Sequence, residues 1–330
     1  MVELDQRASI CTLLALVLKH KTLAGYCNLL NNSLSHEYDV YTVFMNYLEI
    51  DLSNICKNKK LSNSEYDTIK KFILNRKLLK NLLMTYFYGE SIYSQNLGLI
   101  RKYEQDFDTS PSEAVLDFFK AFTKNLSCYL NNVYPSLIDR VEELYSILDD
   151  FIKLNKGLIT LRTPTGDILR WGAKLRKEKK SSRIYYYFFD SFSNTTQKRG
   201  ISQYIKLDKP DNVRTLRSVK SGLIHCLDGA IVRALTLDAL KISPDFIISS
   251  THDSFMFPVK YINEFFDLLE THYYEFDYAT WLEKDVFELN LNLMVENEEK
   301  TILKQKITNF IKKNDKFELD FNIRNLYKPE

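Results

Sequence analysis

Several segments of the chain repeat apolar residues at the three- and four-residue spacing of an amphipathic helix. This pattern predicts helices over residues 9–30, 67–88, 114–130 and 137–154. Further helical patterns occupy residues 222–240 and 262–269. Ser110-Pro111-Ser112-Glu113 carries an early proline and an acidic residue, which are typical of a helix start.

The pattern changes after residue 156. Residues 157–171 predict a strand, a turn and a second strand, with Pro164 and Gly166 supplying the turn. A charged connection over 174–180 leads to an apolar run over 183–189, which predicts another strand. Residues 246–250 and 255–259 predict paired strands around the polar turn 251–254. We therefore expect a mainly helical α+β protein with an antiparallel sheet near residue 253.

The composition supports this picture and excludes some protein classes. Only 9 glycines and 7 prolines interrupt 330 residues, which favours long elements. With 45% hydrophobic and 27% charged residues, the chain is typical of a soluble globular protein. The longest apolar stretch, Cys11 to Leu18, is too short to span a bilayer, so no membrane insertion is expected.

The net charge excludes few kinds of binding partner, and the cysteine content indicates the compartment. A net charge of +2 gives no polybasic field that would indicate a nucleic-acid or membrane partner. It does not exclude a basic channel whose charge is balanced by acidic residues on the outer faces. The five cysteines are odd in number and widely scattered, and they form no C-x-x-C pair. A disulfide scaffold and a cysteine zinc site are therefore not expected, and an intracellular, reducing compartment is.

The residues of the first candidate site recur every four positions along the sequence. Arg76, Lys80, Met84 and Tyr88 lie four positions apart, and Gly89 follows. Because four residues span about 400° on a helix, these side chains line one slowly winding face. Two cations one turn apart suit a triphosphate, and the tyrosine suits a base or a sugar. The alternative is a solvated cationic face beside a buried tyrosine.

His252 and Asp253 stand at the expected tip of a hairpin, between two apolar strands. A carboxylate held in such a turn is able to reach a divalent cation, and Mg²⁺ takes one or two carboxylates together with substrate phosphates. The alternative is an ordinary polar turn, in which aspartate and serine are favoured in any case.

Two further aspartates have ordinary explanations. Asp228, with His225, is interpreted as part of the first turn of a helix, where it complements the helix dipole. Asp5 precedes an apolar helix and is interpreted as its cap. No Gly-x-Ser-x-Gly elbow supports a catalytic triad, and His225, His252 and His272 lack helical metal-ligand spacing.

The order of these positions resembles the C-terminal half of the single-subunit, bacteriophage-type RNA polymerases, which include mitochondrial and linear-plasmid members. The family's fingers-helix motif R-x3-K-x7-Y-G matches at every fixed position, and its H-D-S-F motif matches residues 252–255. Its remaining motifs are an aspartate before a helix, T-P-x-G between strands and H-x-x-D-G. In this sequence they are matched by Asp5 with Ser9 and Asn28-Leu29-Leu30, by Thr163, Pro164 and Gly166, and by His225, Asp228 and Gly229.

The resemblance implies the right-hand architecture of a polymerase. An antiparallel palm sheet with the catalytic hairpin would be formed by residues 1–35 and 225–330, and mainly helical fingers by residues 36–224. Asp5 and Asp253 would hold two Mg²⁺ ions for two-metal phosphoryl transfer.

The resemblance also implies roles around the nucleotide. Arg76 and Lys80 would bind the triphosphate, and Lys80 would neutralise the leaving group. Tyr88 and His225 would read the ribose 2′-hydroxyl, a hydrogen-bonding test that separates rNTP from dNTP. The expected activity is DNA-directed RNA polymerase, with DNA template, nascent RNA and rNTPs as partners. Secondary positions are His252, Gly89 and Asp228.

Some positions depart from the family pattern. Ile10 stands where the family has a glycine near the sugar, and Leu13 stands where it has a histidine. The segment from Phe317 to Tyr327 resembles the family's C-terminal segment, but Lys328-Pro329-Glu330 replaces its last aromatic residues. In the related DNA polymerases, phenylalanine usually follows the lysine by four and the last motif is H-D-E, so Met84 and Ser254 favour the RNA polymerase side.

The first catalytic aspartate is already at position 5. The thumb and the N-terminal domain are therefore expected to be absent and to be supplied by a second polypeptide. The alternative is a polymerase-derived, non-catalytic structural or nucleic-acid-binding subunit of a larger assembly. The family and a composition typical of AT-rich genes together favour a mitochondrial location.

Overall fold

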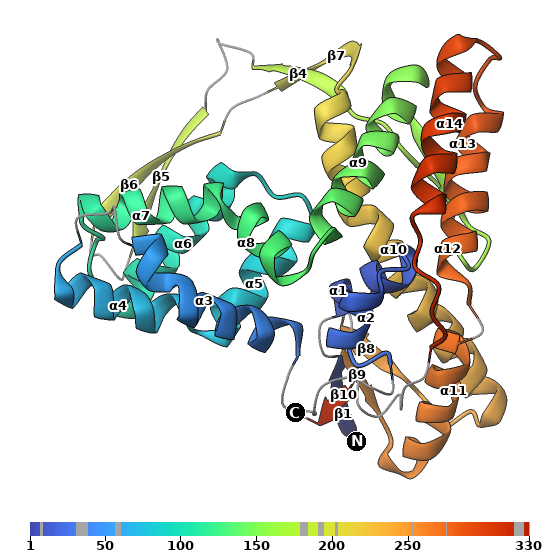
Figure 1. Cartoon of the computed structure of the whole chain (residues 1–330), viewed down its shortest axis with the longest axis horizontal. Coiled ribbons are helices and arrows are strands. Elements are labelled where there is room, and N and C mark those ends of the chain that lie inside the picture. The colour runs from blue at the N-terminus through green and yellow to red at the C-terminus, as the bar shows by residue number, and fades with distance from the viewer. Residues whose placement is uncertain are drawn as a thin grey trace.

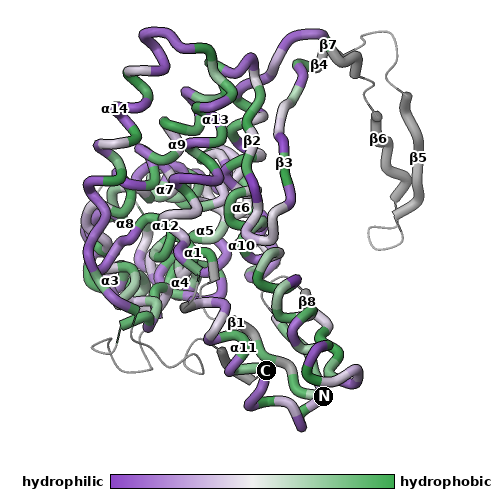
Figure 2. Tube along the Cα trace, turned by 90° about the vertical axis from the view of Figure 1, so that its right-hand side faces the viewer, coloured by the Kyte–Doolittle hydropathy of each residue, from purple (hydrophilic) through white to green (hydrophobic). Residues whose placement is uncertain are grey.

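The computed structural model describes residues 1–6, 9–30, 39–56, 61–178, 184–190, 195–201, 204–251, 254–274, 276–319 and 327–329 (Figure 1). These residues are mostly helical and include small antiparallel sheets, in agreement with the expected α+β class. Apolar residues of neighbouring helices face one another, while polar residues gather on the outer turns (Figure 2).

One sheet joins distant parts of the chain. It has the order β10-β1-β9-β8, and every neighbouring pair is antiparallel. The predicted hairpin is present, but its first strand begins at Ser249, so Phe246 to Ile248 precede it. The strands are β1 (Val2–Gln6), β8 (Ser249–Thr251), β9 (Ser254–Phe257) and β10 (Tyr327–Pro329).

A buried helix follows β1. In α1 (Ser9–Val17) every residue from Ile10 to Val17 is buried, which marks a central core helix apolar on all sides. The single helix predicted over 9–30 is wrong, because the chain turns at Lys19 (φ 47°) before α2 (Lys21–Tyr26). His20 caps this second helix by accepting a hydrogen bond from the Leu23 amide.

Six helices, α3 to α8, form the left part of Figure 1. Two predicted helices are each divided, at Asn75 and at Asn125, and two helices, α3 and α6, were not predicted. The bounds are α3 (Val40–Cys56), α4 (Asn63–Ile73), α5 (Arg76–Phe87), α6 (Ile92–Phe107), α7 (Glu113–Lys124) and α8 (Leu126–Val133).

The right part of Figure 1 is built around a long helix, α10, which packs against α9 and α11. The pattern over 222–240 identified only its second part, because the helix already begins after the Asp211 cap. The helices are α9 (Leu137–Leu154), α10 (Asn212–Ile242), α11 (Ile262–Tyr274), α12 (Tyr278–Trp281), α13 (Leu289–Asn292) and α14 (Glu298–Lys312), with a 3-10 turn η1 (Val259–Tyr261) and a π-helical segment η2 (Leu282–Glu288) between α12 and α13.

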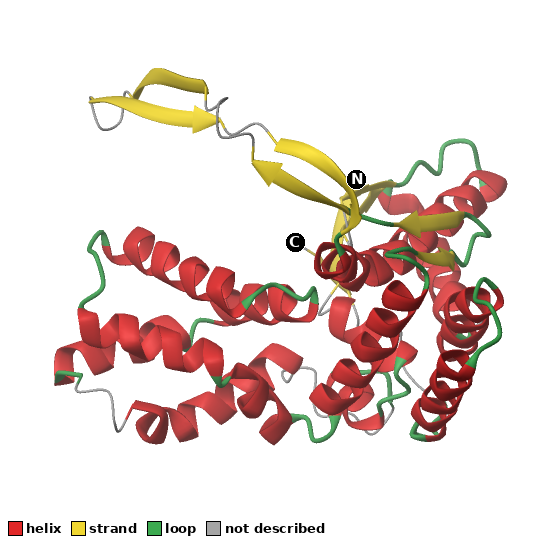
Figure 3. Cartoon of the chain, turned by 90° about the horizontal axis from the view of Figure 1, so that it is seen from above, coloured by secondary structure: helices red, strands yellow, loops and turns green. Residues whose placement is uncertain are grey.

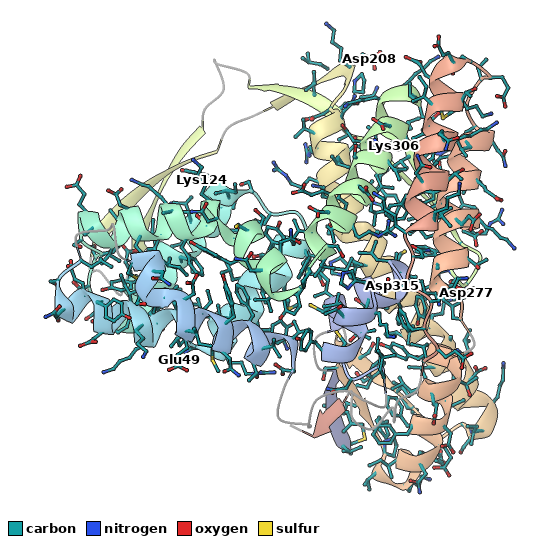
Figure 4. All side chains as sticks on the ribbon, viewed as in Figure 1. Glu49, Lys124, Asp208, Asp277, Lys306 and Asp315 are labelled. Carbon is teal, nitrogen blue, oxygen red and sulfur yellow. The ribbon has the colours of Figure 1, made fainter. Side chains whose placement is uncertain are left out.

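Buried and half-buried cations bind α14 to α9. Arg140 lies over the Phe310 ring and donates hydrogen bonds to the Phe310 carbonyl oxygen (2.7 Å) and to Asn314 Oδ1 (2.6 Å). Lys306, labelled in Figure 4, forms an ion pair with Asp150 of α9. These contacts hold α9 against α14, although the two helices are far apart in the sequence.

A two-stranded β-ribbon leaves the body beyond the hairpin of β2 (Ile159–Arg162) and β3 (Ile168–Trp171). It consists of two pairs in succession, β4 (Lys174–Glu178) with β7 (Tyr204–Pro210) and β5 (Ile184–Asp190) with β6 (Thr195–Ile201). Figure 3 shows that it extends away from the helices. The charged connection predicted over 174–180 is therefore wrong over residues 174–178, which form β4.

Candidate functional site

The sheet register places the first candidate aspartate beside the hairpin. In β1, Asp5 is the antiparallel partner of Ser254, the first residue of β9. Thr251, the last residue of β8, is also paired with Ser254. His252 and Asp253 themselves, and the side chain of Asp5, lie outside the described residues. The backbone of Asp5 nevertheless lies next to Ser254, which follows position 253 in the sequence.

This register changes the interpretation of Asp5. The residue belongs to β1, and α1 begins only at Ser9, so Asp5 is not the cap of that helix. Carboxylate oxygens are the ligands that Mg²⁺ prefers, and Mg²⁺ sites use one or two carboxylates. What the register shows is that the backbone of Asp5 and the first residue of β9 lie side by side, although they are far apart in the sequence.

The cationic motif lies on α5, but its first residue is already engaged. Asn75 caps α5 by accepting hydrogen bonds from the Lys77 and Leu78 amides, so Arg76 is the first helical residue. The Arg76 guanidinium forms an ion pair with Asp39 and lies 5.5 Å from the centre of the Tyr41 ring. In this structure Arg76 therefore ties α5 to the start of α3.

Asp39 was missed by sequence reasoning, although an aspartate three residues before a threonine is a recognisable helix start. Its carboxylate accepts hydrogen bonds from the Thr42 amide (2.9 Å) and the Thr42 hydroxyl (3.0 Å). Burial of Asp39 favours the neutral acid, but the hydrogen bonds from Arg76 and Thr42 outweigh it and lower the pKa of this carboxyl. The Arg76–Asp39 pair thus joins an exposed guanidinium to a largely buried carboxylate.

The other motif residues follow one another along α5. Lys80 is half-buried one turn after Arg76, and Met84 packs against the core. Tyr88 is the last, capping position of the helix. The predicted winding face is thus present, and it runs from an exposed arginine to a half-buried tyrosine.

Tyr88 and His225 meet, although 136 positions separate them. Their rings stack with centroids 4.8 Å apart and an angle of 25° between the ring planes. Tyr88 is half-buried and His225 is exposed. His225 and Asp228 lie in the middle of α10, so the interpretation of Asp228 as a first-turn residue is wrong. The two positions that the resemblance assigns to the sugar are the ones that the fold brings into contact.

Gly89 keeps this contact in place. It has a φ of +78°, and a Cβ atom there would lie 2.5 Å from Cδ of Lys220 on α10. The Lys220 ammonium lies 4.2 Å from the centre of the Tyr145 ring, and the Tyr145 hydroxyl donates a hydrogen bond to the Phe87 carbonyl oxygen (2.6 Å). Burial lowers the pKa of Lys220. Sequence reasoning missed Lys220 and Tyr145, because nothing local marks them as partners of a glycine.

The T-P-x-G segment forms the turn between β2 and β3, as predicted. Gly166 has a φ of +90°, and its amide donates a hydrogen bond to the Thr163 carbonyl oxygen (2.8 Å). Asp167 of the same turn forms an ion pair with Arg233. The turn is therefore fastened to α10, two turns beyond His225.

The side chains that the structure describes contain no group of three or more His, Cys, Asp and Glu residues arranged to hold a metal. Within those residues, no helix combines the length and the apolar character needed to cross a membrane. No protein-family model and no curated protein matches the chain.

Proposed function

We propose that this chain is the palm-and-fingers portion of a DNA-directed RNA polymerase of the single-subunit, bacteriophage type. Its partners would be a DNA template, nascent RNA and rNTPs. The reaction is nucleotidyl transfer from an rNTP to the RNA 3′-hydroxyl.

The observation that carries this proposal is the pairing of Asp5 with Ser254. It supports a common site for positions 5 and 253, which the sequence separates by most of its length. Asp5 and Asp253 would hold two Mg²⁺ ions, which activate the 3′-hydroxyl and neutralise the pyrophosphate. Catalysis then consists mainly of positioning and charge neutralisation.

The contact of Tyr88 with His225 supports the sugar-reading role. A phenol hydroxyl and an imidazole nitrogen, fixed by ring stacking, are able to hydrogen-bond a 2′-hydroxyl that a dNTP lacks. Lys80, one turn from Arg76, would neutralise charge on the triphosphate. Arg76 would have to exchange Asp39 for a phosphate in order to join it.

That ion pair is the observation in favour of the second candidate, a non-catalytic nucleic-acid-binding subunit. With Arg76 bound to Asp39, the residue has a complete structural role in joining α5 to α3. The sequence of the ribbon region is also basic: residues 174–210 contain ten Lys and Arg and three Asp and Glu, whereas the whole chain has a net charge of +2.

Substitution of Asp253 separates the two candidates. The native complex, isolated through a tag on this chain, is given a pre-annealed RNA primer on a DNA template, Mg²⁺ and rNTPs. Asp253→Ala should lower the extension rate by at least about a hundredfold, because the loss of a group that stabilises transition-state charge has effects of this size. Primer–template affinity should stay within about twofold.

Asp245→Ala is the matched control. This aspartate is exposed, lies eight residues away and pairs only loosely with Lys260 at 3.8 Å, so extension should be unchanged. Full extension by the Asp253→Ala complex would contradict the proposal that Asp5 and Asp253 hold two Mg²⁺ ions. A wild-type complex that binds primer–template but never extends it would establish the non-catalytic candidate.

A further inference from the structure

A cavity opens where the ribbon leaves the body. It has a volume of about 490 Å³ and lies between the end of β3, the start of β4 and the first turns of α10. Its lining residues include Arg170, Trp171, Lys174, Arg214 and Ser218. All the charged groups that line it are therefore cations, and they come from three different elements.

The frame of this pocket is fixed by hydrogen bonds between uncharged groups and by close packing. The Ala173 amide donates to the Thr215 hydroxyl oxygen (2.9 Å), and the Ala173 carbonyl oxygen accepts from the Asp211 amide (2.7 Å). The Trp171 indole lies against α10, where a Cβ atom at Gly222 would come within 2.7 Å of its Cζ2 atom. The pocket therefore exists before any ligand binds.

The cations have little internal compensation. Within the described residues, Arg170 and Arg214 form no ion pair with a carboxylate. Lys174 pairs with Asp208 of β7, whose side chain is 94% exposed and is labelled at the ribbon base in Figure 4. The remaining nearby carboxylate, Asp211, caps α10 by accepting from the Arg214 amide (3.0 Å).

This chemistry matches a phosphate better than another anion. Guanidinium groups bind phosphate oxygens in a bidentate fork, and the Ser218 hydroxyl, which donates to the Arg214 carbonyl oxygen (3.1 Å), would have to exchange that acceptor in order to add a further hydrogen bond. An indole beside the cations offers a surface for a base or a sugar, which an acidic peptide would not use.

The pocket shares one face of α10 with His225. Arg214, Ser218 and His225 are separated by four and seven residues, so they lie within about 40° of one another around the axis. From Arg214 to His225 the helix advances about 16 Å, since each residue adds about 1.5 Å. This is roughly the length of five stacked nucleotides. The exposed side chains of this face connect the pocket to the contact of Tyr88 with His225.

We propose that this pocket binds the phosphate backbone of a single nucleic-acid strand, about five nucleotides from the Tyr88–His225 contact. The inference rests on the proposed function only in taking a nucleic-acid strand as the ligand. Arg170, Lys174 and Arg214 hold the phosphates, and Trp171 contacts a base or sugar beside them.

The test uses the fluorescence of Trp171. The chain has two tryptophans, and Trp281 is buried with its indole N–H bound to the Arg162 carbonyl oxygen. In the full-length Trp281→Phe variant, emission therefore reports on Trp171 alone. A 12-nucleotide single-stranded DNA, titrated in EDTA, should quench this emission in a saturable manner. Because neither metal nor rNTP is present, failure of RNA synthesis does not affect the result.

Arg170→Gln and Arg214→Gln should each weaken binding of the 12-mer roughly ten- to a hundredfold, which is typical for loss of a hydrogen bond to a charged group. Each should also lower the slope of log affinity against log salt by about 0.7. Arg217→Gln is the matched control, since Arg217 is an exposed residue of α10 outside the pocket, and should leave the quenching and its midpoint unchanged.

Several results would overturn the proposal. An unchanged Trp171 emission, or equal weakening by Arg217→Gln, would mean that the strand binds elsewhere. Polyglutamate binding as tightly as the 12-mer would identify an acidic-peptide site, and ATP binding as tightly would identify a free-nucleotide site. If Trp281→Phe does not fold, the same arginine variants are compared in the wild-type chain by anisotropy of a labelled 12-mer, with the same expected ratios.

Discussion

At the scale of single residues, the site is held by pairs in which a motif residue meets a partner that no motif names. Arg76 is bound by Asp39, and Gly89 is packed against Lys220. A motif records spacing within one element, and the identity of a partner on another element depends on how the chain folds. The contact of Tyr88 with His225 is different, because both residues belong to motifs.

Gly89→Ala should destabilise the chain by about 1–2 kcal/mol, because a φ of +78° is unfavourable for a residue with a Cβ atom. Gly98→Ala is the control. Gly98 lies within α6, and no neighbouring side chain comes within 4 Å of the place a methyl group would take, so a gain of about 0.5–1 kcal/mol is expected there. Urea unfolding of both variants measures the difference. Equal effects would mean that the backbone at Gly89 is not constrained.

The Arg76–Asp39 pair should make stability depend on pH. The pKa of Asp39 is lower in the folded chain than its ordinary value of 3.8. The stability it adds is therefore present above about pH 4 and is lost as the pH falls through the folded-state pKa. The free energy of unfolding of wild type should exceed that of Asp39→Asn at pH 6, and the gap should narrow at pH 3.

Arg76→Gln provides the complementary measurement. Without the guanidinium, the carboxyl loses a hydrogen bond to its charged form, so its pKa should move back toward the ordinary range. The pH dependence of unfolding should then be flatter than in wild type. An unfolding free energy gap between wild type and Asp39→Asn that is the same at both pH values would contradict this account.

At the scale of elements, asparagine residues divide helices that the apolar pattern alone would join. The pattern over 67–88 continues through Asn75, yet the side chain of Asn75 satisfies the free amides of a new helix start. This break makes Arg76 a first-turn residue, next to Asp39 at the start of α3. The error in the predicted helix therefore explains why the Asp39 pair was missed.

Asn75→Ala should cost about 1 kcal/mol of stability, because the Lys77 and Leu78 amides lose their acceptor. Asn81→Ala is the control within the same helix, since Asn81 is exposed in its interior and alanine is the better helix former there. In thermal or urea unfolding, Asn75→Ala should be less stable than wild type, and Asn81→Ala should be more stable. A neutral Asn75→Ala would mean that α4 and α5 are divided by packing instead of by the cap.

At the scale of the whole molecule, α10 connects the parts. It contacts Trp171 through Gly222, Tyr88 through His225 and the β2–β3 turn through Arg233. The ribbon begins at one end of this helix and extends outward (Figure 3). Of the side chains described between Gly172 and Asp211, none belongs to the hydrophobic core.

Replacing residues 175–209 by Asn-Gly should therefore leave the body folded. Lys174 and Pro210 are cross-strand partners, so a two-residue turn is able to join them. The melting temperature followed by circular dichroism should change by less than about 4 °C, the shift expected for about 1 kcal/mol in a chain of this size. A much larger decrease would show that the ribbon packs against the body.

The sequence by itself determined the candidate residues and most of their local settings. Spacings of four placed Arg76, Lys80 and Tyr88 along one helix, and alternating or apolar runs located the β2–β3 hairpin and the strands around position 253. These features depend on helix and strand periods, which act over a few neighbouring residues.

Only the tertiary structure decided which distant residues meet. The pairing of Asp5 with Ser254, the stacking of Tyr88 on His225 and the pocket between β3, β4 and α10 each join segments that no local period relates. Such contacts form when a shared hydrophobic core is buried. Ordering the long chain segments between them costs conformational entropy, and only the burial achieved by the whole fold offsets that cost. The sequence motifs identified the candidate residues, and the packing of the core around α1 and α10 brought those residues together.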